Sequence, residues 1–254
     1  MVVPVTTATG RAALKLVAPF GDVEAEARAL TVLAGQPVVS LLDADVADRA
    51  LLLERIDGPP LATHGDPSVA VGIAGKVAAG IGTVPAPADA PKLATRATAW
   101  YRAMQEQHTR AQRAGTAVPD DLFRAAIGVV SALPGEATTT MTHGDLSLEN
   151  ILRSASGAWL AIDPLFQCGP VAHETHTVVR SLLPDILMSQ RPAESMRELT
   201  RRFCHEAHVD HDGAQLLSLA RYVASYYWES QHHGDPTNIQ RLRRACDLTY
   251  RLLA

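Results

Sequence analysis

The sequence predicts an α+β fold of two lobes, with a small β-rich lobe over residues 1–57 and a larger helical lobe over residues 58–254. Short β-prone runs dominate the chain as far as residue 56, and Ala- and Arg-rich stretches with helical periodicity fill most of the remainder. Between them, the segment Asp57-Gly58-Pro59-Pro60 breaks regular structure strongly enough to form an interlobe turn. Strands and helices that are segregated along a chain are typical of the α+β class.

The small lobe begins with a predicted hairpin. Residues 2–5 and 12–17 are β-prone, and the polar segment 6–10 (TTATG) lies between them as a turn. Two further β-prone runs, residues 38–42 and 50–56, complete the strands expected in this lobe.

One helix is expected between these pairs of strands, over residues 22–34. Apolar side chains recur there at helical spacing, at Val23, Ala27, Leu30 and Leu33. Asp22 suits the N-cap position, whose side chain accepts a backbone hydrogen bond, and Gly35 suits the end of the helix.

The larger lobe is expected to be mostly helical. Amphipathic stretches predict helices over residues 67–82, 92–114, 119–133, 172–190, 192–208, 213–231 and 237–253. Three short β-prone runs interrupt them, at residues 138–142, 151–153 and 159–162. These runs surround the segment 143–150 (HGDLSLEN), which is dense in polar and ionisable residues.

Composition and charge restrict the classes of function. The chain has 254 residues, of which 47% are hydrophobic and 20% charged, as in ordinary globular proteins. Its formal net charge of -4 disfavours a nucleic-acid partner, which would require a basic surface. The same charge suits a cationic small molecule.

The cysteines and the apolar runs indicate the compartment. Cys168, Cys204 and Cys246 are widely spaced and form no C-x-x-C pair, so neither a disulfide framework nor a cysteine zinc site is expected. The first residues lack the basic and apolar segments of a signal peptide, and no run is long and apolar enough to span a bilayer. We therefore expect a soluble, cytoplasmic protein without membrane association.

The segment 143–150 carries the candidate chemistry. Asp145 and Asn150 lie in it, and Asp163 follows on the next loop, so two carboxylates and an amide oxygen are available. Phosphoryl transfer needs such a set, because Mg²⁺ prefers hard oxygen ligands and a carboxylate must receive the proton of the nucleophile. We expect Asp145 to be the catalytic base, and Asn150 and Asp163 to bind Mg²⁺. His143 would orient the loop.

The pattern H-G-D-x4-N of residues 143–150, followed by Asp163, resembles the catalytic and metal motifs of the aminoglycoside phosphotransferase and choline kinase superfamily, which is related to protein kinases. Three further segments are similar to its streptomycin 6-phosphotransferase and hydroxyurea phosphotransferase branch: residues 159–164 (WLAIDP), 50–55 (ALLLER) and 11–15 (RAALK). The resemblance covers most of the chain and implies a protein-kinase-like bilobal fold.

The resemblance also implies roles in nucleotide binding. Lys15 would contact the α- and β-phosphates of ATP, or of GTP, and Glu26 would be its helix partner, with Glu24 as the alternative. The hinge, whose backbone groups would pair with the adenine edge, would include Glu54 and Ile56. Mg²⁺ would complete the site.

Two departures from the family pattern are apparent. With 14 residues before Lys15, there is room for one strand and a turn but not for the first strand and phosphate-covering loop of relatives. We therefore expect an N-terminally shortened small lobe, whose uncovered sheet edge would allow a homodimer. After Asp163-Pro164 the branch has Lys-Gly, whereas this chain has residues 165–167 (LFQ), so we expect an altered wall of the acceptor site.

These features predict ATP- and Mg²⁺-dependent O-phosphorylation of a small hydroxylated molecule, with an aminoglycoside such as streptomycin as the leading acceptor. Carboxylates that would recognise a guanidinium-bearing acceptor are Glu174, Asp185, Glu229 and Asp235. For Glu174, which lies close to where the family often has an acidic residue, anchoring of the lobe is the alternative role. Hydroxyurea or a metabolite is the alternative acceptor. A different class stays open as well: a non-catalytic, pseudokinase-like binding protein that has kept the fold.

Each feature also has a purely structural interpretation. An H-G-D tripeptide occurs in ordinary turns, Lys15 could be a solvated strand lysine, and Glu26 could be an exposed helical glutamate. The pair Gly75-Lys76 is similar to part of a phosphate-binding P-loop, but Val77 stands where that loop needs Ser or Thr, so we reject it.

Overall fold

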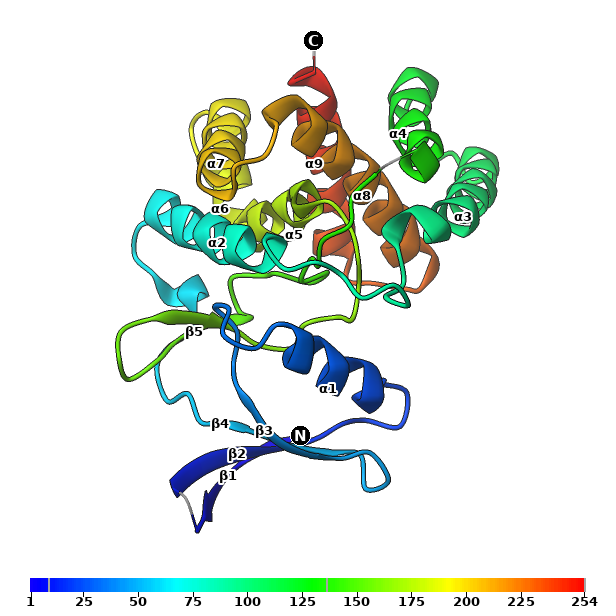
Figure 1. The fold of residues 1–254 in the computed structure, drawn as a ribbon. Coiled ribbons are helices and arrows are strands. Elements are labelled where there is room, and N and C mark those ends of the chain that lie inside the picture. The colour runs from blue at the N-terminus through cyan, green and yellow to red at the C-terminus, as the bar shows by residue number, and fades with distance from the viewer. Residues whose placement is uncertain (9, 136, 254) are drawn as a thin grey trace.

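The structure is a computed structural model that describes residues 1–8, 10–135 and 137–253. It has the expected α+β fold of two lobes, a small antiparallel sheet lobe and a larger helical lobe, with helix α1 lying between the sheet and the helical lobe (Figure 1). Of the helices in the described part of the chain, none combines the length and the apolar character that a membrane span requires.

Four antiparallel strands form the sheet of the small lobe, in the order β1-β2-β4-β3. Their bounds are Val2–Thr7 for β1, Gly10–Leu16 for β2, Leu41–Asp45 for β3 and Ala50–Glu54 for β4. The predicted hairpin is confirmed, with Val2 opposite Lys15, while Thr9 of its predicted turn lies outside the described residues. Because Lys15 also pairs with Leu51, it occupies a central strand.

The prediction of a strand over residues 38–42 is wrong in its first half. Val38 and Val39 are buried, and they leave the sheet to meet the helical lobe. The N–H of Val39 donates to the carbonyl oxygen of Ala161 (2.8 Å), and β3 begins only at Leu41. The two valines of this run therefore pair with β6 at the junction of the lobes, and only the residues from Leu41 onward belong to the sheet.

Helix α1 (Val23–Val32) covers the sheet on the side of the helical lobe (Figure 1). Asp22 caps it as predicted, since its Oδ1 atom accepts a hydrogen bond from the N–H of Ala25 (2.9 Å). The apolar face of α1 packs in a small separate core, which comprises Val23, Leu30, Val39, Leu51 and Leu53. This core holds α1 on the sheet and so sets the position of Glu26 relative to Lys15.

The described part of the helical lobe contains eight α-helices. They are α2 (Pro67–Gly82), α3 (Leu93–Arg113), α4 (Asp120–Ala132), α5 (Glu174–Ser181), α6 (Leu183–Met188), α7 (Pro192–Ala207), α8 (His211–Gln231) and α9 (Pro236–Arg251). The stretch predicted as one helix over residues 172–190 forms both α5 and α6. Pro184 cannot donate the backbone hydrogen bond that a continuous helix needs, and it lies in the first turn of α6 instead.

Two helix-packing contacts organise the large lobe, one around α8 and one between α2 and α7. Helix α8 packs against α4, α5 and α9 and contributes Tyr222 and Tyr227 to the core. Helix α2 packs on α7, where a Cβ atom at Gly75 would lie 2.9 Å from the carbonyl oxygen of Phe203. Gly75 therefore permits close helix packing, which accounts for the Gly-Lys pair without a phosphate-binding role.

A second sheet of two strands, β5 (Ile151–Arg153) and β6 (Trp159–Ala161), lies where the lobes meet (Figure 1). Both strands match predicted runs. The third predicted run, residues 138–142, is not a strand, because it makes isolated bridges to separate loop segments at Thr140 and Met141. The loops that follow Met141 and β6 carry the candidate site.

Arg49 joins the ends of β2 and α1. Its backbone has a φ of 54°, and its half-buried guanidinium donates to the carbonyl oxygens of three residues, Val17, Ala18 and Gly21. We predict that Arg49→Gln lowers the free energy of unfolding by about 1–3 kcal/mol, because these carbonyl groups lose charged donors. Chemical denaturation measures the change, and Arg102→Gln on the exposed side of α3 is the control. Equal stability of the two variants would contradict this role of Arg49.

Candidate active site

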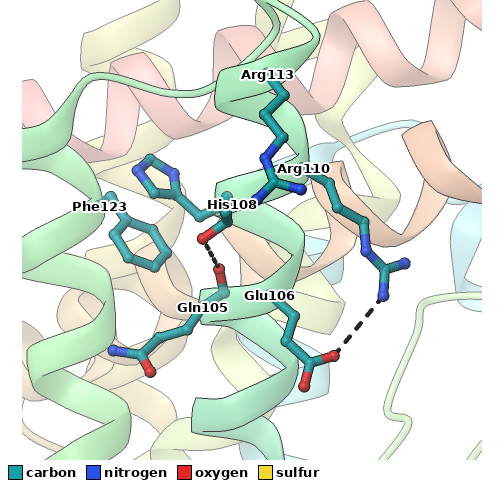
Figure 2. Close-up of a pocket in the computed structure, with 7 residues that line it drawn as sticks. Gln105, Glu106, His108, Arg110, Arg113 and Phe123 are labelled. Carbon is teal, nitrogen blue, oxygen red and sulfur yellow. Dashed lines mark hydrogen bonds and ion pairs between the residues drawn. The ribbon is translucent and has the colours of Figure 1, made fainter.

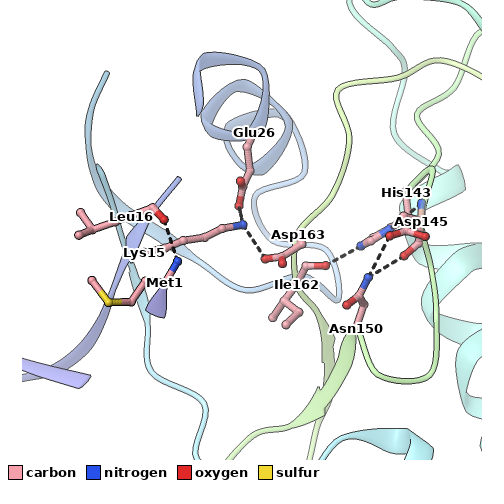
Figure 3. A network of polar contacts seen from close by, with 9 residues as sticks. All are labelled: Met1, Lys15, Leu16, Glu26, His143, Asp145, Asn150, Ile162 and Asp163. Atoms are coloured by element: carbon pink, nitrogen blue, oxygen red, sulfur yellow. Dashed lines mark hydrogen bonds and ion pairs between the residues drawn. The ribbon is translucent and has the colours of Figure 1, made fainter. Parts of the chain in front are cut away.

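His143 ties the candidate catalytic loop to the segment before Asp163 (Figure 3). Its ring is fully buried, its Nδ1 atom accepts the N–H of Asp145 (3.3 Å), and its Nε2 atom lies 2.9 Å from the carbonyl oxygen of Ile162. Because Nδ1 accepts, Nε2 carries the proton and donates to that carbonyl group. Burial lowers the pKa of His143, so the ring is neutral. These contacts orient the loop.

Gly144 allows the loop to turn sharply. Its φ is +84°, and a Cβ atom there would lie 2.8 Å from the Cδ1 atom of Leu165. Any other residue would therefore be strained in its backbone and would clash with that side chain.

Glu174, the first residue of α5, holds the same loop from the core side. Its carboxylate accepts hydrogen bonds from the hydroxyl of Thr142 and from the N–H groups of Gly144 (2.5 Å) and Leu146 (3.1 Å). Burial by itself raises the pKa of this carboxyl, the hydrogen bonds from Thr142 and Gly144 act against burial, and the net shift of the pKa is downward. Glu174 is 1% exposed and faces the loop backbone, which favours the anchoring role expected for it over the acceptor contact.

Asp145 is exposed on the loop, and Asn150 steadies it. The Nδ2 atom of Asn150 donates to the carbonyl oxygen of Asp145 (2.9 Å) and lies 3.5 Å from its Oδ2 atom. Because the amide nitrogen faces Asp145, the amide oxygen of Asn150 is turned away and is left for another partner, such as a cation.

Lys15 bridges the two lobes (Figure 3). Its Nζ atom lies 2.6 Å from Oε1 of Glu26 and 2.9 Å from Oδ1 of Asp163. Burial lowers the pKa of Lys15, but its hydrogen bonds to the two carboxylates outweigh burial and raise it. Burial raises the pKa of Glu26, which shares the ammonium group with Asp163. The structure therefore brings together three residues that the sequence analysis singled out in separate segments.

The donor groups of this site fit Mg²⁺. Asp163 has an unusual φ of 60°, a conformation that costs a non-glycine residue about 1–2 kcal/mol and recurs at functional sites. Its side chain is 46% exposed, and the N–H of Ile162 beside it donates to the carbonyl oxygen of Asn150 (2.8 Å). Asp163 and Asn150 thus offer a carboxylate and an amide oxygen. Mg²⁺ is usually held by one or two such protein ligands, with phosphates and water as the others.

Glu54 and Ile56 lie where β4 ends. The N–H of Glu54 donates to the carbonyl oxygen of Ser40 (2.8 Å), and its carboxylate accepts from the hydroxyl of Ser40 (2.9 Å). Ile56 is half-buried against the small core that α1 and β4 form. The N–H of Glu54 is thus engaged within the small lobe, so a backbone donor for a nucleotide base would come from the residues that follow it.

The other three carboxylates expected near the acceptor are not brought together. Asp235 caps helix α9, where its Oδ1 atom accepts the N–H of Asn238 (2.8 Å). Asp185 of α6 lines a cavity that α2 and α7 also border. Glu229 of α8 is 18% exposed and lies 3.7 Å from Arg180. We therefore place these three side chains at separate positions in the helical lobe.

A cavity of about 350 Å³ opens beside the catalytic loop. Its lining includes Gly144, Leu165, Gln167, Arg96 and Trp100 of α3, and Arg221 of α8. The sequence analysis missed Arg96 and Arg221, because arginines recur along the amphipathic stretches and spacing distinguishes none of them. Leu165 and Gln167 of the altered segment 165–167 do line this cavity.

A larger cavity, of about 540 Å³, lies between α3 and α4 (Figure 2). His108 stacks there on Phe123, with ring centroids 3.8 Å apart, and its Nδ1 atom lies 2.6 Å from the hydroxyl oxygen of Tyr227. Its lining, as far as the chain is described, includes no residue of the catalytic loop. This cavity is therefore separate from the candidate site.

Solved structures that share this fold include a choline kinase and an aminoglycoside phosphotransferase. The choline kinase LicA from Streptococcus pneumoniae superposes with a TM-score of 0.63 over 98% of this chain and 89% of its own, at 14% identity. The aminoglycoside phosphotransferase APH(3'')-Id from Streptomyces rimosus, in complex with ADP and streptomycin, gives a TM-score of 0.59 over 88% of this chain and 92% of its own, at 16% identity. At such identities these structures establish the fold.

Comparison of the amino-acid sequence with known proteins identifies the family of kinases. Residues 1–233 match the profile of a family described as aminoglycoside/hydroxyurea antibiotic resistance kinase. The chain is also 31% identical to streptomycin 6-kinase of Streptomyces griseus over 236 residues, which are 90% of this chain and 74% of that protein. It therefore belongs to the aminoglycoside/hydroxyurea antibiotic resistance kinase family and is a small-molecule kinase.

The buried carboxylate of Glu174 generates a prediction. Glu174→Gln should lower the free energy of unfolding by about 1–3 kcal/mol, because two N–H groups lose a charged acceptor. A carboxyl whose pKa is lowered by folding contributes stability above its unfolded pKa and loses it as pH falls toward the folded value. The difference in the free energy of unfolding between the variant and the parent should therefore shrink as the pH falls below 4.5, the ordinary pKa of a glutamate. Denaturation at several pH values measures it, and a gap that widens on acidification would contradict it.

Proposed function

We propose that this chain transfers the γ-phosphoryl group of ATP to a hydroxyl group of a small molecule in a Mg²⁺-dependent reaction. The observation that carries the proposal is the convergence of Lys15, Glu26 and Asp163 at hydrogen-bond distances. Asp145 and Asn150 lie on the adjacent loop and contact each other. Groups of these kinds position a nucleophile and neutralise phosphate charge, which is most of what phosphoryl transfer requires. Membership of a kinase family supports the same function.

Each residue would have a separate task. Asp145 would accept the proton of the acceptor hydroxyl as the oxygen bonds to the γ-phosphorus and the bond to ADP breaks. Asn150 and Asp163 would hold Mg²⁺, which supplies positive charge to the phosphate oxygens when it is bound. Lys15 would pair with the α- and β-phosphates, and Glu26 would keep its ammonium group in place. The backbone near Glu54 and Ile56 would border the adenine.

Likeness to known proteins favours an aminoglycoside as the acceptor, since the relative from Streptomyces griseus is named streptomycin 6-kinase. Hydroxyurea, which the family description includes, and a hydroxylated metabolite are the alternatives. Measuring ADP release from Mg-ATP with streptomycin, hydroxyurea or choline tests the function. Release that depends on Mg²⁺ and on an acceptor supports it. Nucleotide binding without release, whatever the acceptor, would instead indicate a non-catalytic binding protein.

The base role of Asp145 leads to a prediction about turnover. Asp145→Ala should lower kcat by at least about 100-fold, because the acceptor hydroxyl loses its proton acceptor, while ATP affinity changes by less than about twofold. Steady-state kinetics and calorimetry measure the two quantities, with Glu198→Gln on the exposed side of α7 as the control. A variant with near wild-type kcat would remove Asp145 from this role.

The metal role of Asp163 predicts a different response. Asp163→Asn should lower the affinity for Mg²⁺ and the affinity for ATP together, each by about tenfold, because the metal site loses one formal charge. Calorimetric titrations of ATP at several Mg²⁺ concentrations compare the variant with the parent. Superimposable Mg²⁺ dependences would contradict the assignment of Asp163 as a ligand.

A further inference from the structure

Two cavities beside the candidate catalytic loop adjoin each other. The near cavity, which Gly144 lines, has a volume of about 350 Å³. The far cavity, which residues of α3, α5 and α8 line, has a volume of about 430 Å³. Trp100, Ala224 and Ser225 line both of them. A molecule that reaches the loop at Gly144 can therefore extend along α3 and α8 into the far cavity.

The near cavity offers a buried hydrogen-bond donor that the described chain leaves unused. Gln167 is 3% exposed, and its Oε1 atom accepts a hydrogen bond from Nη1 of Arg96 (3.2 Å). Because a guanidinium can only donate, the amide nitrogen of Gln167 must face elsewhere. That nitrogen is buried and has no hydrogen-bond partner among the described residues. An unsatisfied buried donor is costly, and a hydroxyl oxygen of a bound ring would satisfy it.

The guanidinium of Arg221, which also lines the near cavity, is compensated from within the helical lobe. It donates to Nε2 of His173 (2.5 Å) and to the hydroxyl of Thr177 (3.4 Å). Burial lowers the pKa of Arg221, and the carboxylates of Glu174 and Asp145 act against that shift. The near cavity therefore requires no anionic ligand, and its polar groups suit the hydroxyl oxygens of a ring.

Two tryptophans give the far cavity an aromatic lining. Trp100 of α3 is half-buried, whereas Trp228 of α8 is 53% exposed. The indole of Trp228 stacks on His232, with ring centroids 4.4 Å apart and ring planes 17° from parallel, and this contact supports its orientation. Aromatic faces that are exposed beside a cavity are typical of ligand sites, where they pack on rings and attract cations.

Glu229 adds a carboxylate with unused acceptor capacity to the far cavity. Its side chain is 18% exposed, and its Oε1 atom lies 3.7 Å from Nη2 of Arg180, which is too far for a hydrogen bond. Within the described chain no donor forms a hydrogen bond with this carboxylate, although a carboxylate can accept about four. An ammonium group of a ligand would supply charged donors to it.

We infer that the acceptor has at least two rings, and that Trp228 and Glu229 determine specificity by binding an amino-bearing ring remote from the reacting hydroxyl. The ring with that hydroxyl lies in the near cavity, toward Asp145, and Gln167 donates to one of its oxygens. The remote ring lies on Trp228, and its ammonium group bonds to Glu229. This inference rests on the proposed phosphotransferase function. It disfavours hydroxyurea, which is too small to extend through both cavities.

Streptomycin and its derivatives test the inference, because its methylamino group is on a ring remote from the guanidinium-bearing streptidine ring. N-Acetylation removes the charge of that amine, and streptidine alone lacks the remote rings. We expect kcat/KM for streptomycin to exceed the values for N-acetylstreptomycin, streptidine and hydroxyurea by about tenfold or more each. Mass spectrometry of fragments should place the phosphate on the streptidine ring. Equal values for streptomycin and its N-acetyl derivative, a preference for streptidine or hydroxyurea, or phosphate on the amino-bearing ring would overturn the inference.

Variants of the far cavity identify the residues. Glu229→Gln keeps the shape of the side chain and should lower kcat/KM for streptomycin about tenfold through KM, with little change for streptidine. Trp228→Ala, at a largely exposed position, should cause a similar loss, and Trp228→Phe, which restores an aromatic face, should recover most of it. Glu198→Gln, at an exposed position of α7 that lines neither cavity, is the control. Equal losses for streptomycin and streptidine in Glu229→Gln would overturn the assignment.

Binding and turnover together separate the inference from the proposed function. Streptomycin binding that Glu229→Gln weakens in calorimetry, without ADP release from any acceptor, would overturn phosphoryl transfer and support the site across both cavities. ADP release with streptomycin that neither Trp228→Ala nor Glu229→Gln alters would support phosphoryl transfer and overturn the inference. ADP release with hydroxyurea in the absence of streptomycin binding would do the same, and the absence of both release and binding would overturn both.

Discussion

The ammonium group of Lys15 joins the two lobes of this protein and links the elements that surround the candidate site. It bonds to Glu26 in the small lobe and to Asp163 in the large lobe, and the Lys15 and Glu26 side chains are mostly enclosed. A lysine in such surroundings is stable only while its partners keep close geometry, because loss of one partner leaves a charge poorly compensated. The small core beneath α1 and the contacts of Arg49 supply that geometry.

The candidate catalytic loop takes its conformation from buried groups outside it as well as from its own turns. From the side of the helical core, the Glu174 carboxylate accepts hydrogen bonds from two N–H groups of the loop. His143 connects the loop to the backbone carbonyl group before Asp163. The carboxylate of Glu174 also lies at the start of α5, where the helix dipole favours negative charge. Asp145 can therefore stay exposed on a loop whose backbone is held firmly.

Local patterns predicted a large part of this fold and of its candidate site. Two β-prone runs with a polar turn between them predicted the hairpin that carries Lys15, and apolar periodicity with an Asp cap predicted the helix that carries Glu26. Two predictions failed where distant packing competes with local preference. The backbone of Val38 and Val39 pairs with Ala161 of β6 instead of joining β3, and the run 138–142 meets separate loop segments instead of a partner strand.

The sequence by itself determined the candidate residues for the proposed chemistry and the strands and helices that flank them, because residue type and short spacing are local properties. The tertiary structure decided which side chains face each other across the cavity beside Gly144. Arg96 comes from α3, Gln167 from a loop and Arg221 from α8, and helix packing brings them together. It also turned Glu174 toward the loop backbone. Charge around a cavity depends on the direction in which packed helices point their side chains, and a linear pattern does not record that direction.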